Sequence, residues 1–487
     1  MAQDGGLAVM GNSCGVEGYL KSLEGVGVEY RIVEPEWPGS WEKWWPDPLD
    51  AWPLCNLTLY SGIYRPGGLA VVRPRSVDEL EEVVSRARSH NVCLLPRGGG
   101  SGVLGALAPR DCCVYVDLTG LGWVEPHMEE GYVYSGAGAL LSRVEEILGV
   151  EGYTTGLEPQ SIRVASVGGL VNTLGAGALQ PGIGNIEDVL VFVDMVDGRG
   201  HRLRLGDPRR PRAYGLAGGP FIVAGSEGGL GIVYGVGLRI RRIPRYISSG
   251  TFEFNGVDDA LLVARRLLQW NQPALLRVLD EYEASTLYGK SGTLLLVAYY
   301  DDEDPGVPQA LLEKASKIAG AHSGRATQDI YEKWRETRYD YHKLVEQVAG
   351  IGLWFDTIDV QATWPRLPII HRAVTEKLQV TKGVIGVFSH ISHFNVMGGS
   401  LYTTIIVERD PRTLANAWRV MLDTVLEMGG SVTHHHGVGL QKLYWILRER
   451  PWEVEAYCRV KRVFDPDSIL QAHGLASACR KSEWGAP

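Results

Sequence analysis

The sequence lacks any long uninterrupted run of apolar residues. A membrane-spanning helix needs about 18 or more such residues in a row, and no segment reaches that length. The opening residues Met1 to Met10 also lack the basic start and the apolar stretch of a signal peptide. A transmembrane span is therefore not expected. We predict a cytoplasmic location and leave contact with a membrane surface open.

Positive charge is also in short supply. The chain has 48 lysine and arginine residues against 57 aspartate and glutamate residues, a formal net charge of −9 at pH 7. Because nucleic acids and anionic lipids attract basic surfaces, nucleic acid is not expected as a partner. We predict a small-molecule substrate and assembly as a homodimer.

The cysteines form no recognisable framework. No two are spaced as a CxxC pair, and an odd number spread over 487 residues is unlike a disulfide scaffold or a zinc ribbon. We therefore predict mostly buried thiols. The seven are Cys14, Cys55, Cys93, Cys112, Cys113, Cys458 and Cys479.

Length and glycine are what the chain has in abundance. Its 487 residues exceed one ordinary hydrophobic core, and its 61 glycines are well above the usual share of about 7%. Changes along the sequence predict an irregular N-terminal strap at 1–65 and an α+β domain at 66–245. A second α+β domain follows at 246–430, with a C-terminal segment at 431–487.

The clearest secondary-structure signal begins the first domain. A strand pattern at 69–73 leads to Ser76-Val77-Asp78-Glu79, a capping box that opens a helix. A second strand pattern at 92–95 follows and ends on Pro96. Farther along, Asp197-Gly198 between two strand patterns predicts a hairpin turn.

Three glycine clusters lie within the first domain. They are Pro96-Arg97-Gly98-Gly99-Gly100-Ser101-Gly102, a stretch from Gly168-Gly169 to Gly184, and Gly225-Ser226-Glu227-Gly228-Gly229-Leu230-Gly231. Loops without Cβ atoms expose consecutive backbone N–H groups, which bind phosphate oxygens. Tight turns would account for one such cluster, whereas three together favour a cofactor that carries a pyrophosphate.

Two better-known phosphate motifs are false matches. G-x-G-x-x-G occurs at Gly100, Gly102 and Gly105, but Pro109 and another strand follow where a nicotinamide-binding fold requires a helix. Gly289-Lys290-Ser291 lacks the upstream glycine of a nucleotide P-loop, because residue 284 is alanine.

At these clusters the sequence resembles the FAD-binding domain of the vanillyl-alcohol oxidase flavoproteins. The first glycine loop, Gly156-Leu157-Glu158-Pro159-Gln160-Ser161, Ser166-Val167-Gly168-Gly169, Gly184-Asn185-Ile186-Glu187-Asp188 and Gly225-Ser226-Glu227-Gly228 carry the resemblance, in matching order. It implies an α+β fold with a two-part FAD-binding domain and an α+β substrate (cap) domain that has an antiparallel sheet. The C-terminal segment would close the flavin site.

The resemblance also implies which residues hold FAD. The first loop and Gly168-Gly169 would carry the pyrophosphate, and the backbone near Ile186 and Gly231-Ile232 would receive the adenine and ribose. Binding would be non-covalent, because the first loop carries Ser101 and no histidine. Gly229 and Gln160 depart from the family, where threonine and often aspartate stand. The predicted cofactor-binding residues are Pro96, Arg97, Gly98, Gly99, Gly100, Ser101, Gly102, Glu158, Pro159, Ser161, Val167, Gly168, Gly169, Thr173, Gly184, Ile186, Glu227, Gly231 and Ile232.

Candidate catalytic side chains gather in the second half of the chain. They are Arg277, His390, His393, Tyr402, His434, His435 and His436. Consecutive histidines on a strand or helix cannot all face one point, so at most two of the last three are expected at one site, and no metal site is predicted. His390 and His393, three apart, would point to opposite faces of a strand, which favours His393.

Part of this set resembles the alkyl-dihydroxyacetonephosphate synthase branch of the family, which makes ether lipids. Ser392-His393, Gly399-Ser400-Leu401-Tyr402, His434-His435-His436-Gly437 and Pro273-Ala274-Leu275-Leu276-Arg277 carry this resemblance. It implies that Tyr402 moves a proton on the substrate carbon, Arg277 holds a phosphate or carboxylate, and His393, His434, His435 and His436 polarise substrate oxygens. The flavin N5 would act in a redox-neutral exchange of an acyl for an alkoxy group.

Two other functions stay open. An FAD-linked dehydrogenase of a D-2-hydroxy acid, such as D-lactate or glycolate, would share the flavin site. The usual Asn-Leu-His and Glu-His-Gly patterns of those enzymes are absent, since residue 397 is methionine and the tail reads His-His-Gly. A flavin-binding protein without turnover would require residues 434–436 to be buried packing.

Overall fold

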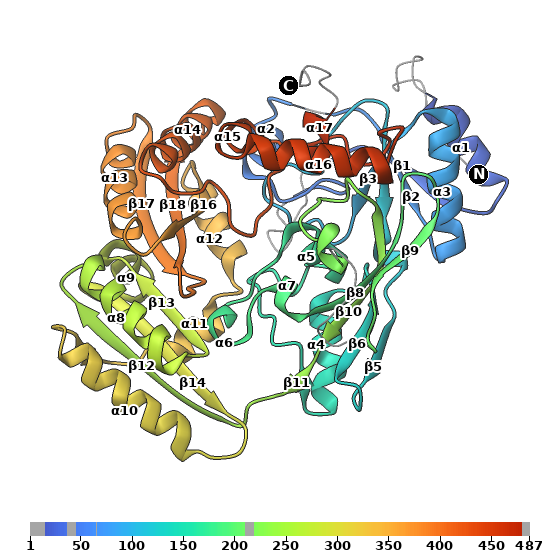
Figure 1. Ribbon diagram of the computed structural model, residues 1–487. Coiled ribbons are helices and arrows are strands. Elements are labelled where there is room, and N and C mark those ends of the chain that lie inside the picture. The colour runs from blue at the N-terminus through green and yellow to red at the C-terminus, as the bar shows by residue number, and fades with distance from the viewer. Residues whose placement is uncertain (1–14, 37–44, 65, 210–218, 480–487) are drawn as a thin grey trace.

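The computed structural model describes residues 15–36, 45–64, 66–209 and 219–479 (Figure 1). Within these residues the strands form a four-stranded sheet, a five-stranded sheet, a two-stranded ribbon and a seven-stranded sheet. The first three come from the first half of the chain and the last from the second half, and the two halves lie side by side. The predicted α+β architecture is confirmed.

The four-stranded sheet has the order β1-β2-β4-β3 and contains the predicted strand, helix, strand unit. β2 and β3 both run parallel to β4, and α3 connects them. The predicted cap is present, because the Ser76 side chain accepts a hydrogen bond from the Glu79 N–H. The elements are β1 Glu29–Val33, β2 Leu69–Arg73, α3 Val77–His90, β3 Cys93–Arg97 and β4 Cys113–Asp117.

The N-terminal segment is more regular than the strap that the sequence suggested. α1 (Val16–Glu24) packs on α3, and β1 pairs antiparallel with β2. Buried Val16, Tyr19, Leu20 and Leu23 recur at helical spacing, which explains why this stretch folds as a helix. Residues 45–52 do run without helix or strand, before α2 (Pro53–Tyr60) begins.

The five-stranded sheet, in the order β5-β6-β10-β8-β9, is antiparallel throughout. The predicted hairpin is confirmed by the pairing of β8 with β9, and Asp197 Oδ1 accepts hydrogen bonds from the N–H groups of Arg199 and His201. The elements of this part are β5 Val124–His127, β6 Tyr132–Gly136, α4 Leu141–Val150, β7 Tyr153–Thr154, α5 Val167–Thr173, α6 Gln180–Ile183, α7 Ile186–Val189, β8 Leu190–Val196, β9 Arg202–Gly206, β10 Ile232–Arg239 and β11 Arg241–Arg242.

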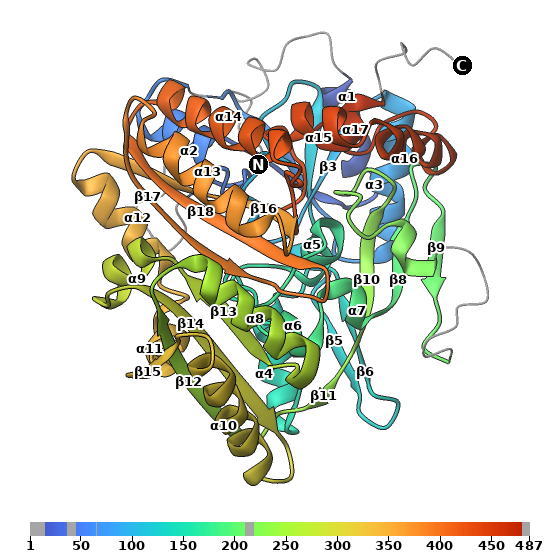
Figure 2. The same ribbon diagram turned by 60° about the vertical axis from the view of Figure 1, so that its left-hand side comes forward.

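The seven-stranded sheet has the order β15-β12-β14-β13-β17-β18-β16, and all its pairings are antiparallel. Figure 2 shows this sheet together with its helices. The elements are β12 Tyr246–Phe254, α8 Val257–Asn271, β13 Leu275–Leu279, α9 Glu281–Tyr288, β14 Thr293–Asp301, α10 Gly306–Gly320, β15 Arg325–Thr327, α11 Tyr331–Thr337, α12 Tyr341–Gly350, β16 Leu353–Thr363, α13 Leu367–Gln379, β17 Val384–Ser392, β18 Gly398–Glu408 and α14 Pro411–Glu427.

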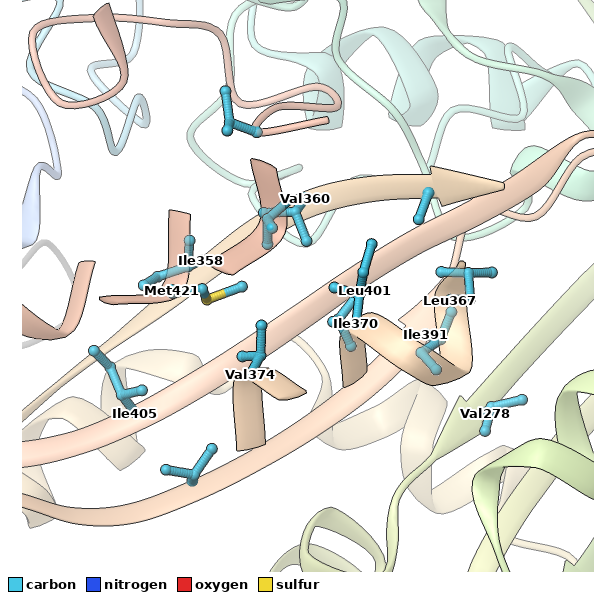
Figure 3. Packing of buried hydrophobic residues seen from close by; sticks show 14 of the residues in the cluster. Val278, Ile358, Val360, Leu367, Ile370, Val374, Ile391, Leu401, Ile405 and Met421 are labelled. Carbon is cyan, nitrogen blue, oxygen red and sulfur yellow. The ribbon is translucent and has the colours of Figure 1, made fainter. Parts of the chain in front are cut away.

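Helices pack against one face of this sheet and form a continuous apolar core with it. Figure 3 shows Ile370 of α13 and Met421 of α14 with Ile358 of β16 and Leu401 of β18. Each fully buried side chain of this kind contributes about 1.5–3 kcal/mol. Leu401 points into this core. Because neighbouring strand residues point to opposite faces of a sheet, the next residue, Tyr402, points away from the core.

The C-terminal segment crosses back to the first half. It forms α15 (Leu443–Glu449), α16 (Pro451–Phe464) and α17 (Gly474–Ala478), drawn in red at the top of Figure 1. From α16, Tyr457 donates a hydrogen bond to the carbonyl of Ser226, and Lys461 donates one to that of Gly229. The third glycine cluster is therefore held by the C-terminal segment.

The prediction of mostly buried thiols is only partly right. Cys55, Cys93 and Cys113 are buried, but Cys458 and Cys479 form a disulfide between α16 and the residue after α17. Cys112 is disulfide-bonded as well, and Cys14 lies outside the described residues. The Cys458 pairing follows from the packing of α17 on α16, which the spacing of the cysteines does not reveal.

Among the helices that the structure describes, none has both the length and the apolar character needed to cross a membrane.

Candidate active site

The first glycine loop lies against the start of the second cluster. The loop follows β3, and a Cβ added at Gly98 would collide with Ser166 Oγ, while one added at Gly99 would collide with the Val164 carbonyl. Ser166 caps α5, since its Oγ accepts a hydrogen bond from the Gly169 N–H. Only glycine lets these two segments approach so closely.

Asn172 joins the second cluster to the third. Its Oδ1 accepts a hydrogen bond from the Gly228 N–H at 2.8 Å, and its carbonyl accepts one from the Glu227 N–H at 3.0 Å. Gly225, Glu227 and Gly228 have φ values of +76°, +54° and +80°, in the region that favours glycine. The three clusters thus meet in one place and fit a pyrophosphate cradle. Sequence analysis missed Asn172.

The remaining predicted cofactor residues lie on or beside these segments. Pro96 is in β3, Ser101 and Gly102 continue the first loop, Pro159 and Ser161 lie between β7 and α5, Val167 and Thr173 begin and end α5, Gly184 and Ile186 flank the start of α7, and Gly231 and Ile232 lead into β10.

Some predicted cofactor residues direct their side chains elsewhere. The Arg97 guanidinium donates to the Pro48 carbonyl and pairs with Asp47 at 2.7 Å. The Glu158 carboxylate pairs with Arg338 at 3.1 Å. At Arg97 and Glu158 the backbone, rather than the side chain, is therefore what a cofactor could use.

The glycine at position 229, where the family pattern has threonine, has a structural explanation. A Cβ at Gly229 would collide with the Tyr457 hydroxyl. Tyr457 therefore occupies the space that a side chain at 229 would need.

A cavity of about 520 Å³ connects these segments with the histidines. Thr173, Asn185, Gly225, His434 and Gly437 are among the residues that line it. A ligand in this cavity would touch both the glycine clusters and the three-histidine segment.

Tyr402 stands at the centre of the histidines. Its hydroxyl lies 3.0 Å from Nδ1 of His393 and 3.0 Å from Nδ1 of His435. His434 Nδ1 lies 2.8 Å from the same His435 nitrogen. The His390 ring stacks on Tyr402 with ring centroids 4.7 Å apart. The phenol and its neighbours form a continuous chain of exchangeable protons.

The expectation that only one of His390 and His393 could reach the site is wrong. β17 ends at Ser392, and His393 has a φ of +49°, so the alternation of a strand does not extend to it. Both rings contact Tyr402.

The limit of two histidines among the final three is wrong as well. Residues 434–436 form a bend, neither a strand nor a helix, and all three rings join the cluster. The His434 ring lies 5.3 Å from His393, and the rings of His435 and His436 lie 5.9 and 6.0 Å from Tyr402.

Two buried carboxylates flank the cluster, and sequence analysis missed both. Glu283 lies 3.1 Å from Arg277 and 3.0 Å from His390 Nδ1. Asp359 Oδ2 accepts a hydrogen bond from the His434 N–H at 3.0 Å, and its Oδ1 lies 3.0 Å from His436 Nδ1. Neither acid belongs to a motif, so only the fold brings them here.

Burial and charge set the protonation of these groups. Burial acts to raise the pKa of Glu283, but His390 and Arg277 outweigh it and lower the pKa. Burial lowers the pKa of His434 to about 4, and it lowers the pKa of His393 and His435 well below the usual range. At neutral pH these three imidazoles are uncharged, and each keeps one ring nitrogen that can accept a hydrogen bond.

Arg277 offers an unused donor. Its Nη2 donates to Glu283, whereas its Nε is buried and has no hydrogen-bond partner among the described residues. A buried guanidinium N–H without a partner is costly, and an anionic oxygen would satisfy it.

Among the residues that the structure describes, no group of three or more histidine, cysteine or acidic side chains is arranged to hold a metal ion.

Two models of known protein families match the chain. The family described as FAD binding domain matches residues 68–206, and the family described as FAD linked oxidases, C-terminal domain, matches residues 243–473. The first match contains the first two glycine clusters, and the second contains Tyr402 and the histidines.

Individual relatives carry the names of more than one kind of enzyme. Alkyldihydroxyacetonephosphate synthase of Dictyostelium discoideum is 24% identical over 450 residues, covering 83% of this chain and 72% of that protein. A mitochondrial D-lactate dehydrogenase of Arabidopsis thaliana is 24% identical over 421 residues, covering 82% and 72%. A solved structure of alkyldihydroxyacetonephosphate synthase shares the fold, with a TM-score of 0.69, 21% identity and coverage of 83% and 77%.

Proposed function

The chain belongs to the FAD-dependent flavoproteins of the vanillyl-alcohol oxidase type, and from that premise we propose that it exchanges an acyl for an alkoxy group on a phosphorylated ketone. Its cofactor is FAD, which we propose is bound without a covalent link. The bound flavin would supply a redox-active, electrophilic ring. Residues 98–102, 166–169 and 225–232 would hold the cofactor.

The position of the Tyr402 hydroxyl is the observation that carries the proposal. Burial raises the pKa of Tyr402 well above 10, so the phenol keeps its proton at neutral pH. It lies 3.0 Å from two neutral imidazole nitrogens, and one of these can take the phenol proton while Tyr402 takes a proton from the substrate carbon. His434 Nδ1 lies 2.8 Å from His435 Nδ1 and extends this proton-transfer route.

Arg277 supports a substrate that carries an anionic group. Its unpartnered Nε would donate to a phosphate oxygen, while Glu283 holds the other side of the guanidinium. In the exchange, the bond from the substrate carbon to the acyl oxygen breaks and a fatty acid leaves. The oxygen of a long-chain alcohol forms the new bond and its proton is released, so no electrons are gained or lost.

Dehydrogenation of a D-2-hydroxy acid is the second candidate. The combination of neutral imidazoles with Arg277 favours it, because an imidazole could accept the hydroxyl proton while the guanidinium holds the carboxylate. The relationship to a D-lactate dehydrogenase supports the same reading.

One anaerobic experiment separates the two reactions. The FAD-loaded protein is mixed with D-lactate and glycolate, and separately with acyl-dihydroxyacetonephosphate and a long-chain alcohol. Under the exchange proposal the hydroxy acids leave the flavin absorbance unchanged and the second mixture yields the alkyl ether by mass spectrometry. Stoichiometric bleaching by a hydroxy acid, with no ether formed, would replace the first proposal with the second.

We further propose the domain limits of 66–245 and 246–430, a homodimer and a cytoplasmic location. Size-exclusion chromatography with light scattering tests the dimer.

A further inference from the structure

Glu227 is a buried acid whose side chain points away from its own glycine cluster and contacts the C-terminal segment. It lies in the third glycine cluster, and only 7% of its surface is exposed. Its Oε1 accepts hydrogen bonds from the backbone N–H groups of Val438 at 2.7 Å and Gly439 at 2.8 Å. Only Gly437 separates these residues from the three histidines. One side chain therefore connects the third cluster to residues 432–439, which we call the histidine loop.

The packing around Glu227 leaves its carboxylate little freedom. A Cβ added at Gly437 would collide with Oε1, and one added at Gly474 would collide with Oε2. Burial raises the pKa of Glu227, while the amides of Gly439, Val438 and Leu475 act in the opposite direction. The contact is thus built from both sides, by an acid in the third cluster and by Gly437 of the loop and Gly474 of α17.

The backbone of Glu227 points to the same conclusion. Its φ of +54° lies between two glycines of positive φ, Gly225 and Gly228. A residue with a Cβ is strained in this conformation, whereas glycine is not. A glutamate at this position therefore has a role that glycine could not fill, and the contact with the histidine loop supplies that role.

Other bonds of the histidine loop go to the second half of the chain. The His434 N–H donates to Asp359, and the Val432 N–H donates to Glu449. Among the described residues, the hydrogen bonds from the loop to residues 66–245 end on Glu227. Two residues past the loop, the Gln441 N–H donates to the Leu104 carbonyl at 3.1 Å, and Gly439 packs closely on the same carbonyl. Beside this backbone contact, Glu227 is a side-chain link through which a change in the cofactor-binding segment can reach the histidines.

We propose that Glu227 is a positioning residue that couples FAD binding to the order of the histidine loop. When bound cofactor restrains the third cluster, the Glu227 carboxylate is held in place. The carboxylate in turn holds the amides of Val438 and Gly439, which follow the histidines. Coupling between two sites is reciprocal, so an intact contact also strengthens FAD binding. The inference depends on FAD binding and not on the exchange reaction, so either can fail without the other.

Hydrogen exchange of the loop, measured by mass spectrometry on FAD-loaded and FAD-stripped protein, tests the coupling. In the wild type, the peptide 432–441 should exchange more slowly when FAD is bound. In Glu227→Ala this difference should disappear. Glu227→Asp, whose carboxylate is one methylene too short, should lose it as well and provides the test if the alanine variant does not fold.

Two variants serve as controls. Glu227→Gln keeps an oxygen that can accept both amides and should retain most of the FAD-dependent difference. Glu145 is a half-buried acid of the first half, and it accepts a hydrogen bond from the Thr155 N–H at 3.0 Å, far from the loop in the sequence. Glu145→Gln should leave the FAD-dependent difference in peptide 432–441 unchanged.

FAD titration by flavin fluorescence gives the reciprocal measurement. Loss of two hydrogen bonds to a carboxylate should weaken FAD binding by on the order of 10-fold in Glu227→Asp and Glu227→Ala. Retention of the FAD-dependent slowing of 432–441 in both variants would overturn the proposal. So would the absence of any FAD effect on this peptide in the wild type.

Discussion

Lys442 and Asp359 form an ion pair behind the three histidines, and neither side chain is exposed. The Lys442 ammonium also donates to the Asp359 carbonyl at 2.8 Å. Burial acts to raise the pKa of Asp359, but His436 and Lys442 outweigh it and hold the pKa well below the usual range. A buried charge pair therefore supports the backbone that carries His434 to His436.

Replacing Asp359 with asparagine should destabilise the protein. The change leaves the Lys442 charge buried without its partner, which costs about 3–5 kcal/mol. Urea unfolding of the FAD-loaded protein measures the loss. The double variant Asp359→Asn with Lys442→Met removes both charges and should recover much of the stability, and a double variant as unstable as the single one would contradict this explanation.

Tyr402→Phe should separate chemistry from cofactor binding. The variant keeps the ring that stacks on His390 but loses the hydroxyl between His393 and His435. Loss of a positioned proton-transfer group should lower the rate constant by about 10²–10⁴-fold. The flavin content of the purified protein should stay at the wild-type value. A rate within a few-fold of wild type would remove Tyr402 from the mechanism.

The buried histidines should make stability fall in mild acid. Burial lowers the pKa of His434 from 6.5 to about 4. Between these values the unfolded chain binds the proton and the folded chain does not, so the stability that the neutral imidazole contributes is present above pH 6.5 and is lost as pH falls toward 4. Urea unfolding at pH 7.5 and pH 5 measures the difference.

His434→Gln should reduce this pH dependence, because the glutamine does not titrate. His201→Gln is a matched control, since the side chain of His201 is 69% exposed, and it should leave the dependence unchanged. An equal pH dependence in His434→Gln and the wild type would show that other groups are responsible.

Local signals in the sequence were sufficient for much of the first half. The Ser76 cap, the Asp197-Gly198 hairpin and the glycine loop after β3 each depend on residues close together in the chain, and such patterns are visible without the fold. α1 was overlooked although its buried residues have a helical period.

The candidate site was harder to predict because its parts meet only in the folded chain. Asp359 and Lys442 are far apart in sequence and belong to no motif. The alternation rule failed at His393 because the strand had already ended. It failed at residues 434–436 because they bend around Tyr402.

Gly99→Ala should release the cofactor. An added Cβ would collide with the Val164 carbonyl, a backbone atom that cannot rotate away, so the first loop must move from the second cluster. Overpacking of this kind costs about 1–3 kcal/mol, and the displacement breaks up the cradle for the pyrophosphate. Visible flavin absorbance per protein chain, after desalting, is the measurement.

Gly149→Ala is the matched control for this change. Gly149 lies in α4, and nothing stands within 4 Å of an added Cβ. Alanine favours a helix over glycine by about 1 kcal/mol, so this variant should keep its flavin and unfold no more easily than the wild type. If Gly99→Ala retained as much flavin as Gly149→Ala, the close contact of the first two clusters would not be what holds the pyrophosphate.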